Sequence, residues 1–439
     1  MFKNLISAFL AFSSSNVTEP IKEQEVAQTP VQTPVQKSEV GLGISSNPST
    51  VNILPGTGEI GRVLFGLKED SPFRLGGVLI SDGDFIATGG ADQGKWSGNN
   101  LVVIGLDVNL NKLCSWKGGS IGAAFLQFNG MNSNARAGSV QGFDSLSVIP
   151  PFGNRSELYE IWFRQSFLDD KLVVRIGKTV PTYDFNNVVR PVPVQDKSLD
   201  IPGVSGLLYT PIFIFPTNLG VMPGYYNSAY GVTVNIAPIK ECYLNLGAYD
   251  GSLANNVQTG LKLGPRFNKY YFFAAETGVS WLPKESRKPG IIALGGWVQT
   301  GKLSIPNVVE QQGAEGIYLF GAQRVWFNHP GIDDSGISVF WQLGYNNGKT
   351  LPANEFIGGG FTAFALTRPK DSFGMGMALS WLNQRIFTRR TEFMVQAYYQ
   401  AHLFHTTYLE PAITYIPNPG GGNNLPQTLT LALQMITLF

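Results

Sequence analysis

The chain is poor in charge, in cysteine and in histidine. Only 14% of its 439 residues are Asp, Glu, Lys or Arg, whereas soluble domains carry about 25%. The net charge of +1 provides neither a basic nor an acidic surface, which argues against a nucleic-acid-binding protein. No stretch approaches the ~20 apolar residues of a membrane-spanning helix. A charge-poor chain with 12% aromatic residues and 51 glycines is typical of a large secreted β protein or of a β-barrel that faces lipid.

Three histidines and two cysteines leave little material for metal or catalytic chemistry. His402 and His405 are three positions apart, which puts them on opposite faces of a strand, so we predict no metal site. No elbow motif marks a nucleophile, and we predict neither catalytic residues nor a cofactor. Cys114 and Cys242 fall near predicted turns about four strands apart, or roughly 20 Å, which exceeds the ~7 Å that a disulfide spans. We expect free thiols or intermolecular links.

The first residues of the chain predict export. MFKNLISAFLAFSSS has a lysine, an apolar run and then small residues, the pattern of a signal peptide (residues 1–15) cleaved among Ser13 to Ser15. Residues 16–69 contain the repeat TPVQTPVQ and many Pro, Thr, Gln and Ser, with too few apolar residues to build a core. We interpret this segment as a disordered periplasmic leader, and a linker without function is the alternative.

From residue 70 onward the sequence predicts one strand after another. In TLTLALQMITLF, the residues Leu429, Leu431, Leu433 and Met435 share one apolar face, and Gln434 lies on the other. Most segments of this kind have about ten residues, the length of a tilted membrane strand. No segment of ten or more residues shows a helical period. We predict sixteen strands, at about 73–86, 101–110, 119–129, 156–167, 171–178, 228–237, 240–249, 270–281, 290–299, 316–327, 336–345, 356–367, 373–382, 391–403, 407–416 and 428–439.

The predicted connections alternate between short and long. LDD and FHT join strands as tight turns, whereas GMNSNARAGSVQGFDSLSVIPPFGNR and residues 179–227 form long loops. Transmembrane barrels have short periplasmic turns and long external loops. Closure pairs the last strand with the first, so no strand edge stays exposed. We therefore predict an all-β fold for residues 70–439, a sixteen-stranded antiparallel transmembrane β-barrel in the outer membrane of a Gram-negative bacterium.

Several segments occur in the order found in one porin family. The most specific is EIWFRQSF followed by DDKLVVRIGK and by the pair Asp184 and Phe185, and others are FFAAETGVSW, IIALGGWVQTG and EPAITYIPNPGG. Together they resemble the carbohydrate-selective porin family (OprB-type) over about residues 70–439. The resemblance implies a monomeric sixteen-stranded barrel in contact with outer-membrane lipid. In general appearance the chain also resembles the chlamydial branch of that family, whose members take up L-arginine.

The terminal aromatic residue gives a further resemblance. Phe439 on an alternating strand resembles the assembly signal of bacterial outer-membrane proteins, which implies the outer-membrane assembly machinery as a partner. Thr437 departs from this pattern, because the signal usually has a bulkier apolar residue there.

Strand alternation sorts the charged side chains into the lumen. A cation on the lipid face near the midplane would cost about 2–4 kcal/mol, so charged residues are expected on the inner face. Carboxylates pair bidentately with guanidinium groups, and their small excess favours a cationic solute, although pairing among these charges is the alternative. The predicted pore-lining wall residues are Glu160, Trp162, Arg164, Arg175, Glu241, Glu276, Arg324, Glu392 and Glu410.

The longest loop, residues 179–227, has room to fold into an open lumen. It carries Asp184, Tyr225 and Tyr226, which suit a selectivity constriction, and a cap over the pore mouth is the alternative. The sequence therefore predicts a porin for facilitated diffusion of a small solute. L-arginine is favoured on the chlamydial resemblance, and a glucose-type carbohydrate is the alternative. A non-transporting barrel, either an adhesin or a membrane hydrolase, is the alternative from another class.

Overall fold

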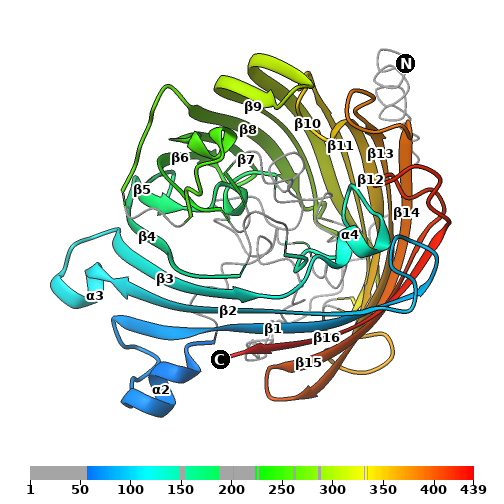
Figure 1. The fold of residues 1–439 in the computed structure, drawn as a ribbon. Coiled ribbons are helices and arrows are strands. Elements are labelled where there is room, and N and C mark those ends of the chain that lie inside the picture. The colour runs from blue at the N-terminus through cyan, green and yellow to red at the C-terminus, as the bar shows by residue number, and fades with distance from the viewer. Residues whose placement is uncertain are drawn as a thin grey trace, which may run out of the picture. The chain divides into compact units, whose positions relative to one another are not determined.

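The computed structural model describes residues 57–148, 154–186, 201, 223–224, 227–260, 264–284, 288–330, 332–333 and 335–439. Its strands form one closed antiparallel barrel, in which each strand pairs with its neighbours in sequence and β1 pairs with β16 (Figure 1). The predicted fold class is confirmed. The strands are β1 (Phe73–Thr88), β2 (Trp96–Asn109), β3 (Gly119–Asn129), β4 (Arg155–Phe167), β5 (Leu172–Thr179), β6 (Ala229–Ile239), β7 (Cys242–Asp250), β8 (Tyr271–Trp281), β9 (Gly290–Ile305), β10 (Val309–Phe327), β11 (Gly336–Asn346), β12 (Ala353–Phe364), β13 (Ser372–Leu382), β14 (Thr391–Phe404), β15 (Thr407–Ile416) and β16 (Thr428–Leu438).

The helices in the described part of the chain are short. They are α2 (Glu59–Phe65), α3 (Leu110–Cys114), α4 (Ser133–Ala137), η3 (Pro181–Tyr183) and η6 (Ser252–Asn255). None of them is long and apolar enough to cross a bilayer. The predicted signal peptide lies outside the described residues, as does all of the predicted leader except residues 57–69, which contain α2.

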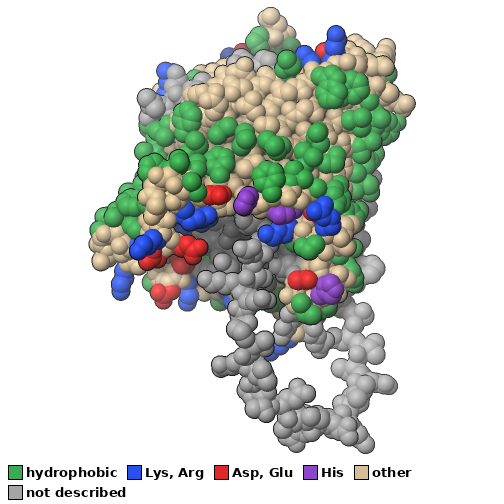
Figure 2. Space-filling view, turned by 90° about the horizontal axis from the view of Figure 1, so that it is seen from below, with side chains coloured by type: hydrophobic (Ala, Val, Ile, Leu, Met, Phe, Trp, Pro, Cys, Tyr) green, Lys and Arg blue, Asp and Glu red, His purple; other side chains and the backbone are tan. Residues whose placement is uncertain are grey.

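The alternation read from the sequence sets the two faces of the wall. On β16, the side chains of Leu431, Leu433 and Met435 are exposed on the outer face, whereas Gln434 and Ile436 are fully buried on the inner one. Figure 2 shows apolar side chains spread over the outer wall, with Lys, Arg, Asp and Glu gathered toward the rims. An outer surface of this kind is suited to lipid, because charge near the membrane midplane is costly.

The hairpin of β9 and β10 is longer than its sequence predicts. Only residues 306–308 connect the two strands, which pair with each other as far as Ile305 and Val309. Residues 300–315 are mostly polar and lack an alternating apolar face. The alternation typical of a membrane strand therefore ends before the pairing of the two strands does. Lys302 Nζ lies 2.7 Å from Glu310 Oε1 across the hairpin. The expected long external loop at this position is therefore a strand extension.

Phe439 lies at the seam where the barrel closes. Its backbone N–H donates to Gly77 O at 3.0 Å, and its carbonyl accepts from Gly77 N at 2.7 Å, so the β1–β16 pairing continues through the last residue. A Cβ on Gly77 would lie 2.9 Å from the Phe439 ring and 2.0 Å from Val103 O, so a side chain at position 77 would disturb the seam.

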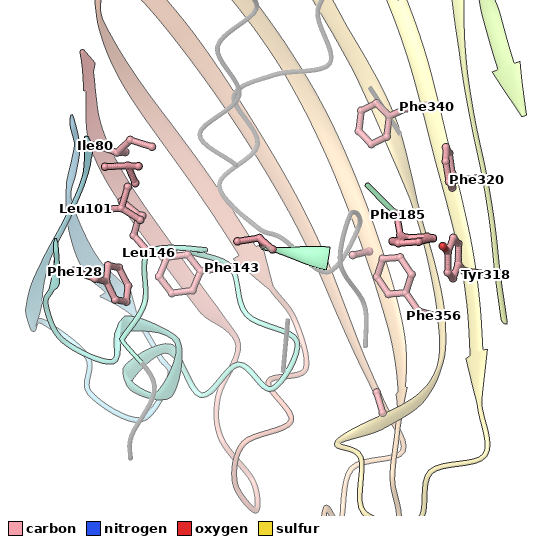
Figure 3. Packing of buried hydrophobic residues seen from close by; sticks show 14 of the residues in the cluster. Ile80, Leu101, Phe128, Phe143, Leu146, Phe185, Tyr318, Phe320, Phe340 and Phe356 are labelled. Atoms are coloured by element: carbon pink, nitrogen blue, oxygen red, sulfur yellow. The ribbon is translucent and has the colours of Figure 1, made fainter. Parts of the chain in front are cut away.

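Two long connections fold into the barrel. Figure 3 shows Phe143 and Leu146, from the β3–β4 connection, over the inner face near Ile80 and Leu101. Phe185, from the β5–β6 connection, lies on the other side of the barrel interior. These connections bring loop residues into contact with wall residues that are distant in sequence, and the lumen site is built from both.

Candidate functional site in the barrel lumen

Arg175 on β5 pairs with the first residues of the β5–β6 connection. Its guanidinium donates to Asp184 and lies 5.7 Å from the centre of the Trp162 ring, on the neighbouring strand β4. Asp184 also accepts from Thr233 Oγ1 at 3.2 Å. Burial raises the pKa of the Asp184 carboxyl, and the positive charge of Arg175 opposes that rise. The predicted lumen residues Trp162, Arg175 and Asp184 therefore form one charge-compensated cluster.

Glu276 on β8 receives the same connection farther across the lumen. Asn186 N donates to its carboxylate at 2.5 Å, and the hydroxyls of Tyr243 and Tyr318 each donate at 2.8 Å. The Asn186 side chain in turn accepts from Gln342 on β11. The described start of the β5–β6 connection thus runs inside the barrel from β5 to β11. Its inward position agrees with the constriction hypothesis, which remains a prediction because residues 187–200 and 202–222 lie outside the described part.

Glu160 on β4 holds the connection at its first residue. Its carboxylate accepts from Val180 N at 3.2 Å, immediately after β5 ends. Both Glu160 and Glu276 are buried and face the lumen, as the strand alternation predicted. Their described contacts fasten a loop to the wall, so these carboxylates are not presented to a passing cation as the arginine hypothesis requires.

Glu392 on β14 fastens the β3–β4 connection in the same way. Its two oxygens accept from Ser139 Oγ at 2.7 Å and from the backbone N–H groups of Val140, Gln141 and Gly420 at 2.9, 3.0 and 2.6 Å. Four donors engage both oxygens of one buried carboxylate. The sequence predicted Glu392 in the lumen but assigned no inward role to the loop that it binds.

Small residues on the inner face of β13 make room for that connection. Gly374, Gly376, Ala378 and Ser380 all point inward. Gln141 donates to Ala378 O at 3.4 Å and accepts from Ser380 Oγ at 2.8 Å. The sequence suggests that such small inward residues leave room for water, but at Ala378 and Ser380 the space is taken by the loop.

Of the remaining predicted wall residues, Glu410 and Arg324 lie apart from these clusters, whereas Arg164 lies directly opposite Arg175 in the β4–β5 pairing. Glu410 and Arg324 are fully buried on the inner face, where Glu410 accepts from Gln400 at 2.6 Å and Arg324 donates to Ser338 at 3.2 Å. Arg164 lies 3.6 Å from Asp170 of the β4–β5 turn, at the end of the lumen that has the short turns.

Two further predictions concern residues away from the described lumen wall. Glu241, predicted to line the wall, lies in the two-residue turn between β6 and β7, beside Lys240, and its backbone carbonyl accepts from Ser280 N on β8 at 2.7 Å. It therefore lies at the end of the wall that has the short turns, and its role in the pore stays a prediction. Tyr225 and Tyr226 lie outside the described residues. Cys114 and Cys242 are both free thiols.

Sequence reasoning missed several polar residues of the lumen. Asn186, Gln342 and Tyr318 are uncharged, and a search for charges on the inner face does not detect them. Asp82 and Asp84 were missed although both lie on one face of β1, and two carboxylates two positions apart on a strand are a readable signal.

A closed barrel with an apolar outer wall, a polar lumen and inward loops defines a membrane-spanning pore protein. The profile described as "Carbohydrate-selective porin, OprB family" matches residues 100–439. The chain belongs to this family. With its fold, this membership makes the chain an outer-membrane porin of a Gram-negative bacterium, as the sequence predicted.

Individual relatives agree with this assignment. Porin B of Pseudomonas aeruginosa is 23% identical over 395 residues, which are 80% of this chain and 84% of the relative. A high-pH structure of Pseudomonas putida OprB superposes with a TM-score of 0.71 at 18% identity, covering 84% of this chain and 94% of that one. A low-pH structure of the same protein gives 0.56 at 16% identity, covering 87% and 97%. At these identities the structures support the fold alone.

Proposed function

We propose that this porin passes small neutral carbohydrates by facilitated diffusion. The description of the family supports a carbohydrate solute, and the arginine hypothesis gains no support from the relatives. The structural observation that carries the proposal is that the charged side chains of the clusters around Arg175, Glu276 and Glu392 already have partners on the wall or in the inward connections. Arg175 pairs with Asp184, and Glu276 and Glu392 are saturated by hydrogen-bond donors.

A lumen of this kind suits a polyol better than an ion. Charged groups whose oxygens and N–H groups are already engaged offer a permeating ion few direct contacts, so an ion would lose hydration with little compensation. A sugar exchanges hydrogen bonds with water and with polar side chains at little net change in free energy. Weak contacts of this type are what a diffusive channel needs, because a tightly held solute blocks the flux.

Solute flux into proteoliposomes tests the proposal. We expect glucose to enter faster than L-arginine and faster than a dicarboxylate of similar size, because only the neutral solute avoids the cost of desolvating a charge. Osmotic swelling rates, measured with purified protein at equal solute concentrations, give the comparison. If arginine enters faster than glucose, the carbohydrate proposal is wrong and the arginine hypothesis returns.

A single substitution shows whether charge compensation is responsible. Asp184→Asn removes the partner of Arg175 but keeps the shape of the side chain, so the lumen gains an unbalanced positive charge. We expect the dicarboxylate rate to rise and the arginine rate to fall relative to glucose. Glu241→Gln is the matched control, because this carboxylate lies in a turn away from the described lumen contacts. Equal selectivity in both variants would contradict the role given to the Arg175–Asp184 pair.

A further inference from the structure

Three carboxylates meet where the β3–β4 connection touches the wall. Asp82 and Asp84 lie on the inner face of β1, and Asp144 comes from the inward connection. One oxygen from each lies within 4.8 Å of the others. The three residues are 8%, 0% and 2% exposed. None belongs to the lumen clusters described above, and all lie toward the end of β1 that precedes an external connection.

This acidic cluster has no ion-pair partner in the part of the chain that the structure describes. Among the described residues, no Lys, Arg or His forms a salt bridge with Asp82, Asp84 or Asp144. The hydrogen-bond donors of the cluster are concentrated on Asp144, which accepts from Ser133 Oγ at 2.7 Å, Leu146 N at 2.7 Å and Asn99 Nδ2 at 3.2 Å. A buried group of like charges requires a counter-charge or a proton.

A second observation points to a ligand. Within the described part of the chain, both carboxylate oxygens of Asp82 and one oxygen of Asp84 have no hydrogen-bond partner. The hydroxyl of Ser97 has none either; it is 3% exposed and lies directly opposite Asp84 in the β1–β2 pairing. Buried oxygens without donors are the atoms that a hard cation would take, since carboxylate and hydroxyl oxygens bind it without a proton on the ligand side.

We propose that Asp82, Asp84 and Asp144 bind one Ca²⁺ ion, which ties the β3–β4 connection to the wall at β1. Ca²⁺ takes oxygen ligands at about 2.3–2.6 Å, so two oxygens across one ion lie at most about 4.6–5.2 Å apart, in agreement with the spacing of the cluster. Ca²⁺ is preferred over Mg²⁺ because the oxygens come from a loop and a strand of different stiffness, and Mg²⁺ demands near-ideal octahedral geometry. Ser97 Oγ supplies a further oxygen.

Calcium binding to the refolded barrel tests this site. Protein is refolded from inclusion bodies into neutral detergent, freed of lipopolysaccharide and treated with a chelator before equilibrium dialysis against radioactive calcium. We expect one ion per barrel, with a Kd of roughly 10⁻⁴–10⁻³ M or tighter, and weaker competition by Mg²⁺. If the three carboxylates share protons instead of binding a cation, no saturable calcium binding will be seen. That result overturns the proposal. Tighter binding of Mg²⁺ overturns the assignment to calcium.

Substitutions of the proposed ligands test whether calcium binds at this cluster. Asp144→Asn and Asp82→Asn are expected to weaken calcium binding by more than roughly tenfold, since even changes around metal ligands cost about 10–100-fold. Asp169→Asn, which changes an exposed carboxylate of the β4–β5 turn, is the matched control and should bind as the wild type does. Heat-modifiable migration identifies the folded fraction of each variant. Unchanged affinity in folded Asp144→Asn contradicts the site.

A second readout follows the loop itself. Arg136 lies on α4, within the connection that the ion would hold. Calcium should slow tryptic cleavage after Arg136 in the wild type and in Asp169→Asn, but not in Asp144→Asn. Equal slowing in all three proteins would separate calcium binding from the loop and would overturn the tie between them.

Discussion

Removal of Phe439 is expected to prevent most of the protein from reaching the outer membrane in cells. Two effects combine. The deletion removes the two backbone hydrogen bonds to Gly77, together worth about 1–3 kcal/mol, and it removes the aromatic ring proposed as the assembly signal. The amount of heat-modifiable barrel in isolated outer membranes measures the result. The same deletion in protein refolded in detergent should lower stability only by the smaller, local amount.

Phe439→Ala separates these two contributions. Alanine keeps the backbone pairing with Gly77 and loses the ring, so the refolded variant should be nearly as stable as the wild type. If the ring acts as the signal, assembly in cells falls as far as it does in the deletion. Normal amounts of Phe439→Ala in the outer membrane would show that the seam alone accounts for the residue.

Glu392→Gln is expected to release the β3–β4 connection from the wall and to raise single-channel conductance. In the wild type the donors meet two carboxylate oxygens, whereas the glutamine amide would present an NH₂ group in place of one of them. At least one buried N–H would then lose its acceptor, at a cost of about 1–3 kcal/mol. A freed connection no longer narrows the lumen to a fixed size. Planar-bilayer recordings should show larger and noisier currents, and swelling assays should show entry of larger sugars.

Glu410→Gln provides the comparison for this effect. Glu410 is as deeply buried as Glu392, and its carboxylate accepts from Gln400 on the neighbouring strand. Its described hydrogen bond joins two wall strands, so its substitution perturbs the wall and no described contact of an inward connection. Equal conductance changes in the two variants would mean that any loss of a buried charge disturbs the pore, and the anchoring role of Glu392 would then be wrong.

The wall of the barrel is predictable from sequence because every strand repeats one local rule. Lipid on one side and water or loops on the other force a period of two, and this period locates β3, β15 and β16 almost to the residue. The rule fails where the environment is the same on both faces. The polar ends of β9 and β10 beyond the membrane were missed for this reason. The start of β2 at Trp96 was missed because its buried face carries the polar residues Ser97 and Asn99.

The lumen is less predictable because its contacts join distant parts of the chain. Alternation assigns Glu160, Glu276 and Glu392 to the inner face correctly, but it says nothing about what lies opposite them. Their partners come from loops whose paths depend on the closed barrel, as with Val180 and Ser139. Strand alternation therefore predicts which face of the wall a side chain lies on. The role of that side chain depends on tertiary contacts that no local sequence pattern contains.

The two inward connections also have a mechanical meaning. A ring of strands one layer thick is easily flattened, because bending it needs little change in any single hydrogen bond. The β5–β6 connection joins β5 to β8 and β11, and the β3–β4 connection joins β3 to β13 and β14, so each acts as a chord across the ring. Connections of fixed length across the barrel keep its cross-section from becoming oval under lateral pressure from the bilayer. We expect the pore of this protein to keep a nearly constant cross-section in membranes of different tension.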